Sequence, residues 1–256
     1  MKRKEKFLDD AADRMAHFGF REVGIEEKSG LVHGVFESVA DRYDLMNDLM
    51  SCGIHRLWKA SLIDQLRPHS DMHLLDVAGG TGDIAFRYRD AGGGKVTVCD
   101  INWSMIEVGR DRAIDQNRLA DVAWLLGDAE ALPVPNCSVD AYTIAFGLRN
   151  VSRIDEALTE AHRVLRPGGR FLCLEFSQVV DQVLASFYDR FSFSVLPALG
   201  RAIAADAGAY RYLAESIKQF LSQEELVRAI QAAGFERVSY RNMTRGVAAI
   251  HEGWRI

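Results

Sequence analysis

Three aspartates and a glycine-rich loop are the strongest candidates for ligand binding in this chain. Asp76 precedes the loop Gly79-Gly-Thr-Gly82, and Asp100 and Asp128 end the next two apolar runs. Glycines let the backbone approach a ligand closely, and carboxylates accept hydrogen bonds from hydroxyl and amino groups. The pattern predicts a nucleoside-type ligand held by the loop and the three carboxylates.

The glycine pattern alone leaves two classes of ligand open. Residues 80–85 satisfy G-x-G-x-x-A, a dinucleotide fingerprint, and Asp100 suits the ribose hydroxyls of any adenosine. Asp76 would repel the phosphates of a dinucleotide, but it suits the amino group of a methionine moiety. Asp128 can accept from an adenine amino group, and an acidic pocket stabilises a cationic sulfonium. We therefore predict S-adenosyl-L-methionine as the cofactor, with a Rossmann-type NAD(P)-dependent oxidoreductase as the alternative.

The segments that must position these residues alternate between strand-like and helix-like patterns. Expected strands cover residues 73–78, 95–100, 122–128, 139–146 and 170–176, and expected helices cover 84–90, 105–117 and 154–165. This alternation is typical of βαβ units, so we expect an α/β fold with a Rossmann-like, doubly wound sheet. The sequence Arg166-Pro-Gly-Gly169 predicts a sharp stop before the fifth strand. A helix over 223–233 and strands over 235–241 and 246–251 should complete the sheet.

Three further segments surround this regular core. Residues 1–30 are charged and interrupted by glycine, so we expect a flexible N-terminal arm followed by a single domain over residues 31–256. Apolar residues between 35 and 66 recur at three- and four-residue steps, which predicts an N-terminal helical cap over the front of the core. About forty aromatic-rich residues after Phe176 form an expected insertion, and such insertions are usually functional.

The composition limits the partners and the compartment. A net charge of −5 over 256 residues argues against nucleic acid as a partner. The four cysteines, at positions 52, 99, 137 and 173, have no paired spacing, and the histidines show no metal-ligand spacing, so we expect no metal site. The N-terminus lacks the apolar stretch of a secretory signal. We expect a cytoplasmic protein, and a peripheral position on the inner membrane stays open.

Longer motifs are more specific than the glycine loop. They are Val35-Phe-Glu-Ser-Val-Ala-Asp-Arg-Tyr-Asp-Leu-Met-Asn47, Gly53-Ile-His-Arg-Leu-Trp-Lys59, Phe146-Gly-Leu-Arg-Asn-Val151, Arg163-Val-Leu-Arg-Pro-Gly-Gly169, Leu174-Glu-Phe-Ser177 and Tyr210-Arg-Tyr-Leu-Ala-Glu-Ser-Ile217. Together with the glycine loop, they resemble the ubiquinone/menaquinone biosynthesis C-methyltransferase family over nearly the full length. Members of that family methylate demethylmenaquinol and 2-methoxy-6-polyprenyl-1,4-benzoquinol. The resemblance implies a class I S-adenosylmethionine-dependent methyltransferase fold.

The resemblance also implies cofactor contacts at Thr81, Asp100 and the pair Asp128-Ala129, in agreement with the residues' own chemistry. The full predicted cofactor-binding set is Asp76, Gly79, Gly80, Thr81, Gly82, Asp100, Asp128, Ala129 and Ala145. At position 145 the family often has serine, so a hydroxyl contact is missing here and only backbone groups can bind.

The implied reaction needs an electron-rich ring carbon, so the expected acceptor is the reduced quinol. Arg149 and Asn150 follow the fourth strand, where guanidinium and amide donors can hold a phenolate oxygen. Because arginine stays protonated, we assign proton removal to Tyr43, His55 or water. A surface ion pair is the alternative role of Arg149. Packing and helix capping are the alternatives for Tyr43 and His55.

The chain's partners follow from the same resemblance. Residues 187–197 are apolar enough to line a groove for an isoprenoid tail, although a homodimer contact or simple core packing would suit them equally. The sequence does not choose between a benzoquinol, a naphthoquinol or both as acceptor. A membrane contact and a quinone-biosynthesis complex stay open as partners. A non-catalytic scaffold in such a complex is the second alternative function, disfavoured because the ligand carboxylates are kept.

Overall fold

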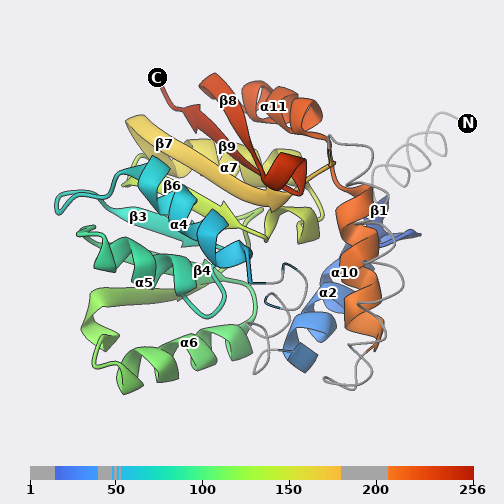
Figure 1. The fold of residues 1–256 in the computed structure, drawn as a ribbon, viewed down its shortest axis with the longest axis horizontal. Helices are drawn as coiled ribbons and strands as arrows, with labels where there is room; N and C mark the ends of the chain where they lie inside the picture. The colour runs from blue at the N-terminus through green and yellow to red at the C-terminus, as the bar shows by residue number, and fades with distance from the viewer. Residues whose placement is uncertain (1–14, 40–47, 49–50, 52, 180–206) are drawn as a thin grey trace, which may run out of the picture.

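A seven-stranded sheet with helices on both faces forms the centre of the computed structural model, which describes residues 15–39, 48, 51, 53–179 and 207–256 (Figure 1). The strands of this sheet are β3 (Leu74–Val77), β4 (Val96–Asp100), β5 (Val122–Leu126), β6 (Val139–Ala145), β7 (Leu165–Phe176), β8 (Glu236–Met243) and β9 (Ala248–Trp254). The helices around it are α4 (His55–Leu66), α5 (Asp83–Asp90), α6 (Trp103–Asp115), α7 (Ile154–Val164) and α11 (Gln223–Ala232). Short 3-10 turns are η2 (Leu119–Asp121), η3 (Leu148–Asn150) and η5 (Thr244–Gly246).

The strand order is β5-β4-β3-β6-β7-β9-β8, and it confirms the predicted doubly wound sheet. Strands β3 to β7 pair in parallel, with Leu74 opposite Val96 on one side and Ala141 on the other. Strand β9 runs antiparallel to both of its neighbours. The chain order reverses direction beside β3, so the carboxyl ends of β3, β4 and β6 open into the crevice where such sheets bind ligands.

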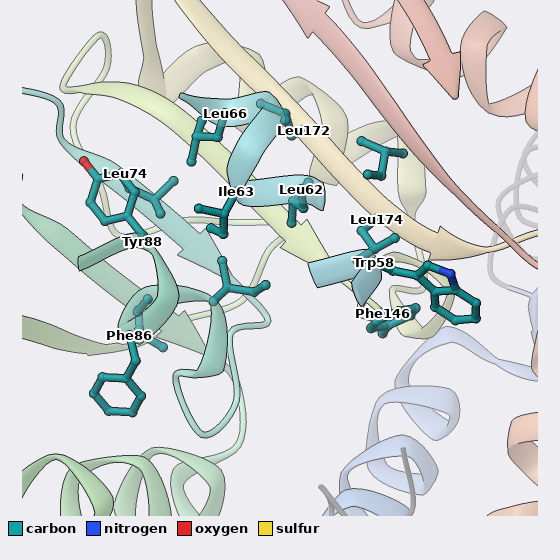
Figure 2. Close-up of a cluster of buried hydrophobic side chains, with 14 of the residues drawn as sticks. Trp58, Leu62, Ile63, Leu66, Leu74, Phe86, Tyr88, Phe146, Leu172 and Leu174 are labelled. Atoms are coloured by element: carbon teal, nitrogen blue, oxygen red, sulfur yellow. The ribbon is translucent and has the colours of Figure 1, made fainter. Parts of the chain in front are cut away.

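Two apolar layers, one on each face, hold the helices to the sheet. Successive strand residues point to opposite faces, so Leu74 packs in one cluster and Leu75 in the other. The first cluster joins the sheet to α4 and α5 and contains Trp58, Leu62 and Tyr88 (Figure 2). The second joins it to α7 and α11. Burial on both faces explains why the parallel strands read as continuous apolar runs.

The turn expected at residues 166–169 lies inside a strand. Strand β7 begins at Leu165, which pairs with Val139, and the ladder resumes with Arg170 opposite Ala141. The intervening residues form a bulge in which Gly168 has φ +83°, a conformation that glycine adopts without a steric penalty. The Pro-Gly-Gly sequence therefore interrupts the ladder inside β7 and does not separate this strand from helix α7.

The N-terminal region forms a cap beside the sheet, together with a helix from the segment after β7 (Figure 1). It consists of the hairpin β1 (Met15–Phe18) and β2 (Arg21–Gly24), the helix α2 (Ile25–Val39) and the later helix α10 (Ala207–Gln219). The boundary expected at residue 30 falls inside α2, and the described part of the expected arm has regular structure. Helix α10 contacts both α2 and β1. Within the described ranges, no helix is long and apolar enough to cross a membrane.

Candidate active site

A cavity of about 580 Å³ lies at the carboxyl ends of β3, β4, β5 and β6, under helix α2. The glycine loop forms one wall, and the segments that follow β4, β5 and β6 form the others. Residues of α2 line it as well: Ile25, Glu26, Ser29, Gly30, Val32 and His33. Every residue of the predicted cofactor set except Gly82 lines this cavity.

The glycine loop is shaped by contacts that leave no room for side chains. A Cβ on Gly79 would lie 2.7 Å from Asp76 Oδ2 and 2.9 Å from Val98 Cγ1, and Gly80 has φ +53°. Gly82 also has positive φ, but it caps the start of α5 against Trp124. Its role is therefore to turn the chain, whereas Gly79 and Gly80 present the backbone to the cavity.

Asp76 lines the cavity, and the described residues leave one of its two carboxylate oxygens without a partner. It is fully buried, and its Oδ1 accepts a hydrogen bond of 2.7 Å from Thr143 Oγ1. Its Oδ2 has no hydrogen-bond partner among the described residues. Burial raises the pKa of Asp76 to about 7. A buried, unpartnered carboxylate oxygen fits a cationic ligand group, such as the amino group of S-adenosylmethionine.

Asp100 and Asp128 line the cavity, and both also accept hydrogen bonds from backbone N–H groups. Asp100 Oδ2 accepts from Gly80 N and Oδ1 from Asn102 N, both at 2.8 Å. Each carboxylate oxygen has a second lone pair, so both remain able to accept from ribose hydroxyls. Asp128 Oδ1 accepts from Glu130 N at 2.9 Å. Burial raises the pKa of Asp100, and hydrogen bonds from backbone N–H groups oppose that rise.

Lys59 is a cavity residue that the sequence analysis missed. It lies on the buried face of α4, and its Nζ donates to Asp83 Oδ2 at 2.8 Å. Burial raises the pKa of Asp83, but Lys59 and Arg87 outweigh it and hold that pKa below its usual range. The sequence did contain a signal for Lys59. It falls on the same helix face as Leu62, Ile63 and Leu66, and a lysine buried there without a partner would destabilise the fold.

Asn150 lines the cavity, whereas Arg149 does not. Asn150 Oδ1 accepts a hydrogen bond of 3.0 Å from the hydroxyl of Tyr212 on α10. Arg149 Nη1 donates to Glu175 Oε1 at 2.8 Å, and the two side chains are 3% and 1% exposed. The alternative of a surface ion pair for Arg149 is therefore wrong, because β6 and β7 bring the pair into the core. Glu175 also accepts from the backbone N–H groups of Arg149 and Phe176.

The remaining predicted site residues fall in different places. His55 does not line the cavity: it is buried at the start of α4, where its Nδ1 lies 2.8 Å from Ser51 Oγ. Burial lowers its pKa. Ala145 lines the cavity at the end of β6. Tyr43 and residues 187–197 lie outside the described residues. Among the described side chains, no group of three or more His, Cys, Asp or Glu is arranged to hold a metal ion.

The fold and the cavity define a class I S-adenosylmethionine-dependent methyltransferase. A solved S-adenosylmethionine-dependent methyltransferase of Thermotoga maritima, described as a possible histamine N-methyltransferase, has the same fold. Its TM-score is 0.64 at 20% sequence identity, over 88% of this chain and 100% of that one. Residues 22–255 match the model of the ubiE/COQ5 methyltransferase family. The chain belongs to that family, which excludes the oxidoreductase alternative.

Two curated relatives illustrate the similarity. The ubiquinone/menaquinone biosynthesis C-methyltransferase UbiE of Paracoccus denitrificans is 55% identical over 94% of this chain and 96% of its own length. The mitochondrial 2-methoxy-6-polyprenyl-1,4-benzoquinol methylase of Bos taurus is 50% identical over 94% of this chain and 83% of its own length. The family resemblance expected from the motifs is thus confirmed.

Proposed function

We propose that this enzyme methylates a ring carbon of a polyprenylated quinol, either 2-methoxy-6-polyprenyl-1,4-benzoquinol, demethylmenaquinol or both. The proposal rests on one observation: groups suited to the methyl donor and a group suited to the quinol acceptor line the same cavity. Carboxylates suited to a cationic methyl donor line one part, and the Asn150 amide at the end of η3 lines another. The names of the two relatives point to the same acceptors.

The donor side would hold S-adenosylmethionine through complementary charges. Asp100 would accept from the ribose hydroxyls and Asp128 from the adenine amino group. The Asp76 Oδ2, which has no partner among the described residues, would accept from the donor's amino group, and Lys59 Nζ would bind the donor's carboxylate. Thr81, Ala129 and Ala145 would contact the donor from the walls. When bound, the cofactor supplies a methyl group activated by a sulfonium.

The acceptor side would stabilise negative charge on the quinol oxygen next to the reacting carbon. The Asn150 amide can donate to that oxygen because it lines the cavity, and Arg149 holds the η3 turn through its bonds to Glu175. We assign proton removal to water or Tyr43, since His55 lies off the cavity wall.

The test is methyl transfer from labelled donor to both acceptors in reduced form, each compared with its oxidised counterpart. Label should enter the reduced ring only, because the quinone carbon is electron-poor. Transfer to neither reduced acceptor would contradict the acceptor class. Equal rates with oxidised and reduced rings would contradict the mechanism.

We also propose that the protein is cytoplasmic and meets its acceptor at the surface of the inner membrane, because a polyprenyl tail partitions into lipid. Residues 187–197 would receive that tail, with a homodimer contact as their alternative role. Sedimentation with vesicles that contain a polyprenyl quinol should enrich the protein in the pellet. Equal recovery with and without vesicles would refute the surface contact.

A further inference from the structure

The motif around Tyr212 lies on α10, outside the sheet, and neither the donor site nor the acceptor chemistry described above explains it. Tyr212 is only 5% exposed. The ring stacks on Phe18 of the N-terminal hairpin, with centroids 4.2 Å apart and planes inclined by 16°. Its hydroxyl reaches across to η3 and meets Asn150 Oδ1 at 3.0 Å. One side chain therefore joins α10, the hairpin and the turn that bears Asn150.

The hairpin and α10 are fixed to each other by a second contact from the same motif. Glu215 Oε2 accepts a hydrogen bond of 3.2 Å from Phe20 N. Gly19 has φ +60°, and a Cβ on it would collide with the Glu215 carboxylate. Packing thus holds the Tyr212 ring independently of the hydrogen bond from its hydroxyl to Asn150, as a positioning group requires.

The bond from Tyr212 decides which end of the Asn150 amide faces the cavity. The hydroxyl is buried, and within the described residues its only hydrogen bond is to Asn150 Oδ1. Turning the amide over would leave the buried hydroxyl proton without an acceptor, which is unfavourable. With Oδ1 engaged by Tyr212, the amide nitrogen is the end left to donate into the cavity.

We propose that Tyr212 is a positioning residue that keeps Asn150 oriented as a hydrogen-bond donor toward the acceptor oxygen. The inference rests on the proposed function, in which Asn150 meets the quinol. A phenolate oxygen only accepts hydrogen bonds, so the oriented amide favours it, whereas an amide turned over would present a carbonyl oxygen and repel it. The neighbouring residue is held as well, because Lys28 Nζ on α2 donates to Val151 O at 2.8 Å.

The experiment compares Tyr212→Phe with Tyr240→Phe in the full chain. Phenylalanine at 212 keeps the stack on Phe18 and removes only the hydroxyl. Tyr240 is the matched control, because its hydroxyl donates to Glu224 Oε1 at 2.9 Å on the surface, away from the cavity. We expect Tyr212→Phe to lower kcat with reduced acceptor by about tenfold to thirtyfold, the scale of a slightly misplaced group. Donor Kd should stay within about twofold, and Tm should match that of the control.

A cycle with Asn150→Ala separates positioning from general support. In that background Tyr212→Phe should lower kcat no further, because there is no amide left to orient. Independent, multiplying losses would overturn the inference, as would a Tyr212→Phe kcat within twofold of the parent. A joint fall in Tm and donor affinity would also overturn it. If instead Asn150→Ala retains the parent rate, or the parent methylates no quinol, it is the proposed function that fails.

Discussion

The donor side and the acceptor side of the cavity are built in opposite ways. On the donor side, β3, β4 and the loop after β5 each contribute a carboxylate, and Asp76 keeps an oxygen without a partner among the described residues. On the acceptor side, side chains pair with one another, Arg149 Nη1 with Glu175 and Asn150 with Tyr212. The donor side is thus prepared to bind a charged ligand, and the acceptor side is prepared to hold one geometry.

The largest expected effect tests the acceptor side as a rigid frame. Glu175→Gln leaves the buried Arg149 charge uncompensated, so the free energy of unfolding should fall by about 3–5 kcal/mol in urea denaturation. Glu156→Gln is the control, because its pair with Arg153 is 2.9 Å long but 46% and 44% exposed. That variant should not measurably change stability. Equal losses of stability in the two variants would show that the buried pair contributes no more to stability than the exposed pair.

The next effect tests the donor side as a binding surface. Asp100→Ala should weaken S-adenosylmethionine by about 1.5–3 kcal/mol, the scale of hydrogen bonds to a charged group, measured by calorimetry. Asp140→Ala serves as control, since Asp140 also accepts a backbone bond, from His73 N at 2.8 Å, but lies off the cavity. Its donor Kd should match the parent's. An unchanged Kd in Asp100→Ala would remove the ribose assignment.

A smaller effect follows from the pKa of Asp76, which burial raises to about 7. The donor's amino group favours ionised Asp76, so donor affinity should be roughly fivefold to tenfold weaker at pH 6 than at pH 7.5. Asp76→Asn should bind weakly and lose this pH dependence.

Without donor, the stability of the protein should change in the opposite direction with pH. The folded state keeps the Asp76 proton to higher pH than the unfolded state does, so this group makes the free energy of unfolding fall as pH rises from about 4 to 7. Asp76→Asn should remove that contribution, which denaturation at several pH values would measure. A parent donor affinity that is flat from pH 6 to 7.5 would contradict an Asp76–amino contact.

The smallest effect concerns the tether from α2. Lys28→Met removes the bond to Val151 O but keeps an apolar stem, so stability should stay within about 1 kcal/mol of the parent. The turn with Asn150 would be held less firmly, and kcat should fall about twofold to fivefold in single-turnover assays. A larger fall than that of Tyr212→Phe would make α2, and not α10, the main support of the acceptor side.

The amino-acid sequence alone is enough to predict the sheet and the donor side of the cavity. Apolar runs alternating with helical patterns predict parallel strands, and the carboxyl ends of neighbouring parallel strands meet at one edge. The glycine loop, Asp100 and Asp128 therefore had to converge, and they line one cavity. Gly82 is the one residue of the predicted cofactor set that does not line the cavity. Its positive φ is required by the turn into α5 and does not indicate a ligand contact.

The acceptor side is assembled from segments that are far apart in the chain and meet through packing. Arg149 and Glu175 are 26 residues apart, Asn150 and Tyr212 are 62 apart, and Lys28 and Val151 are 123 apart. Local pattern does not specify which of many polar groups will meet over such distances, since the pairing depends on how elements pack and which side chains become buried. The partner of Lys59, Asp83, likewise lies on another helix. Burial then fixes these pairs, because a polar group removed from water must find a partner within the fold.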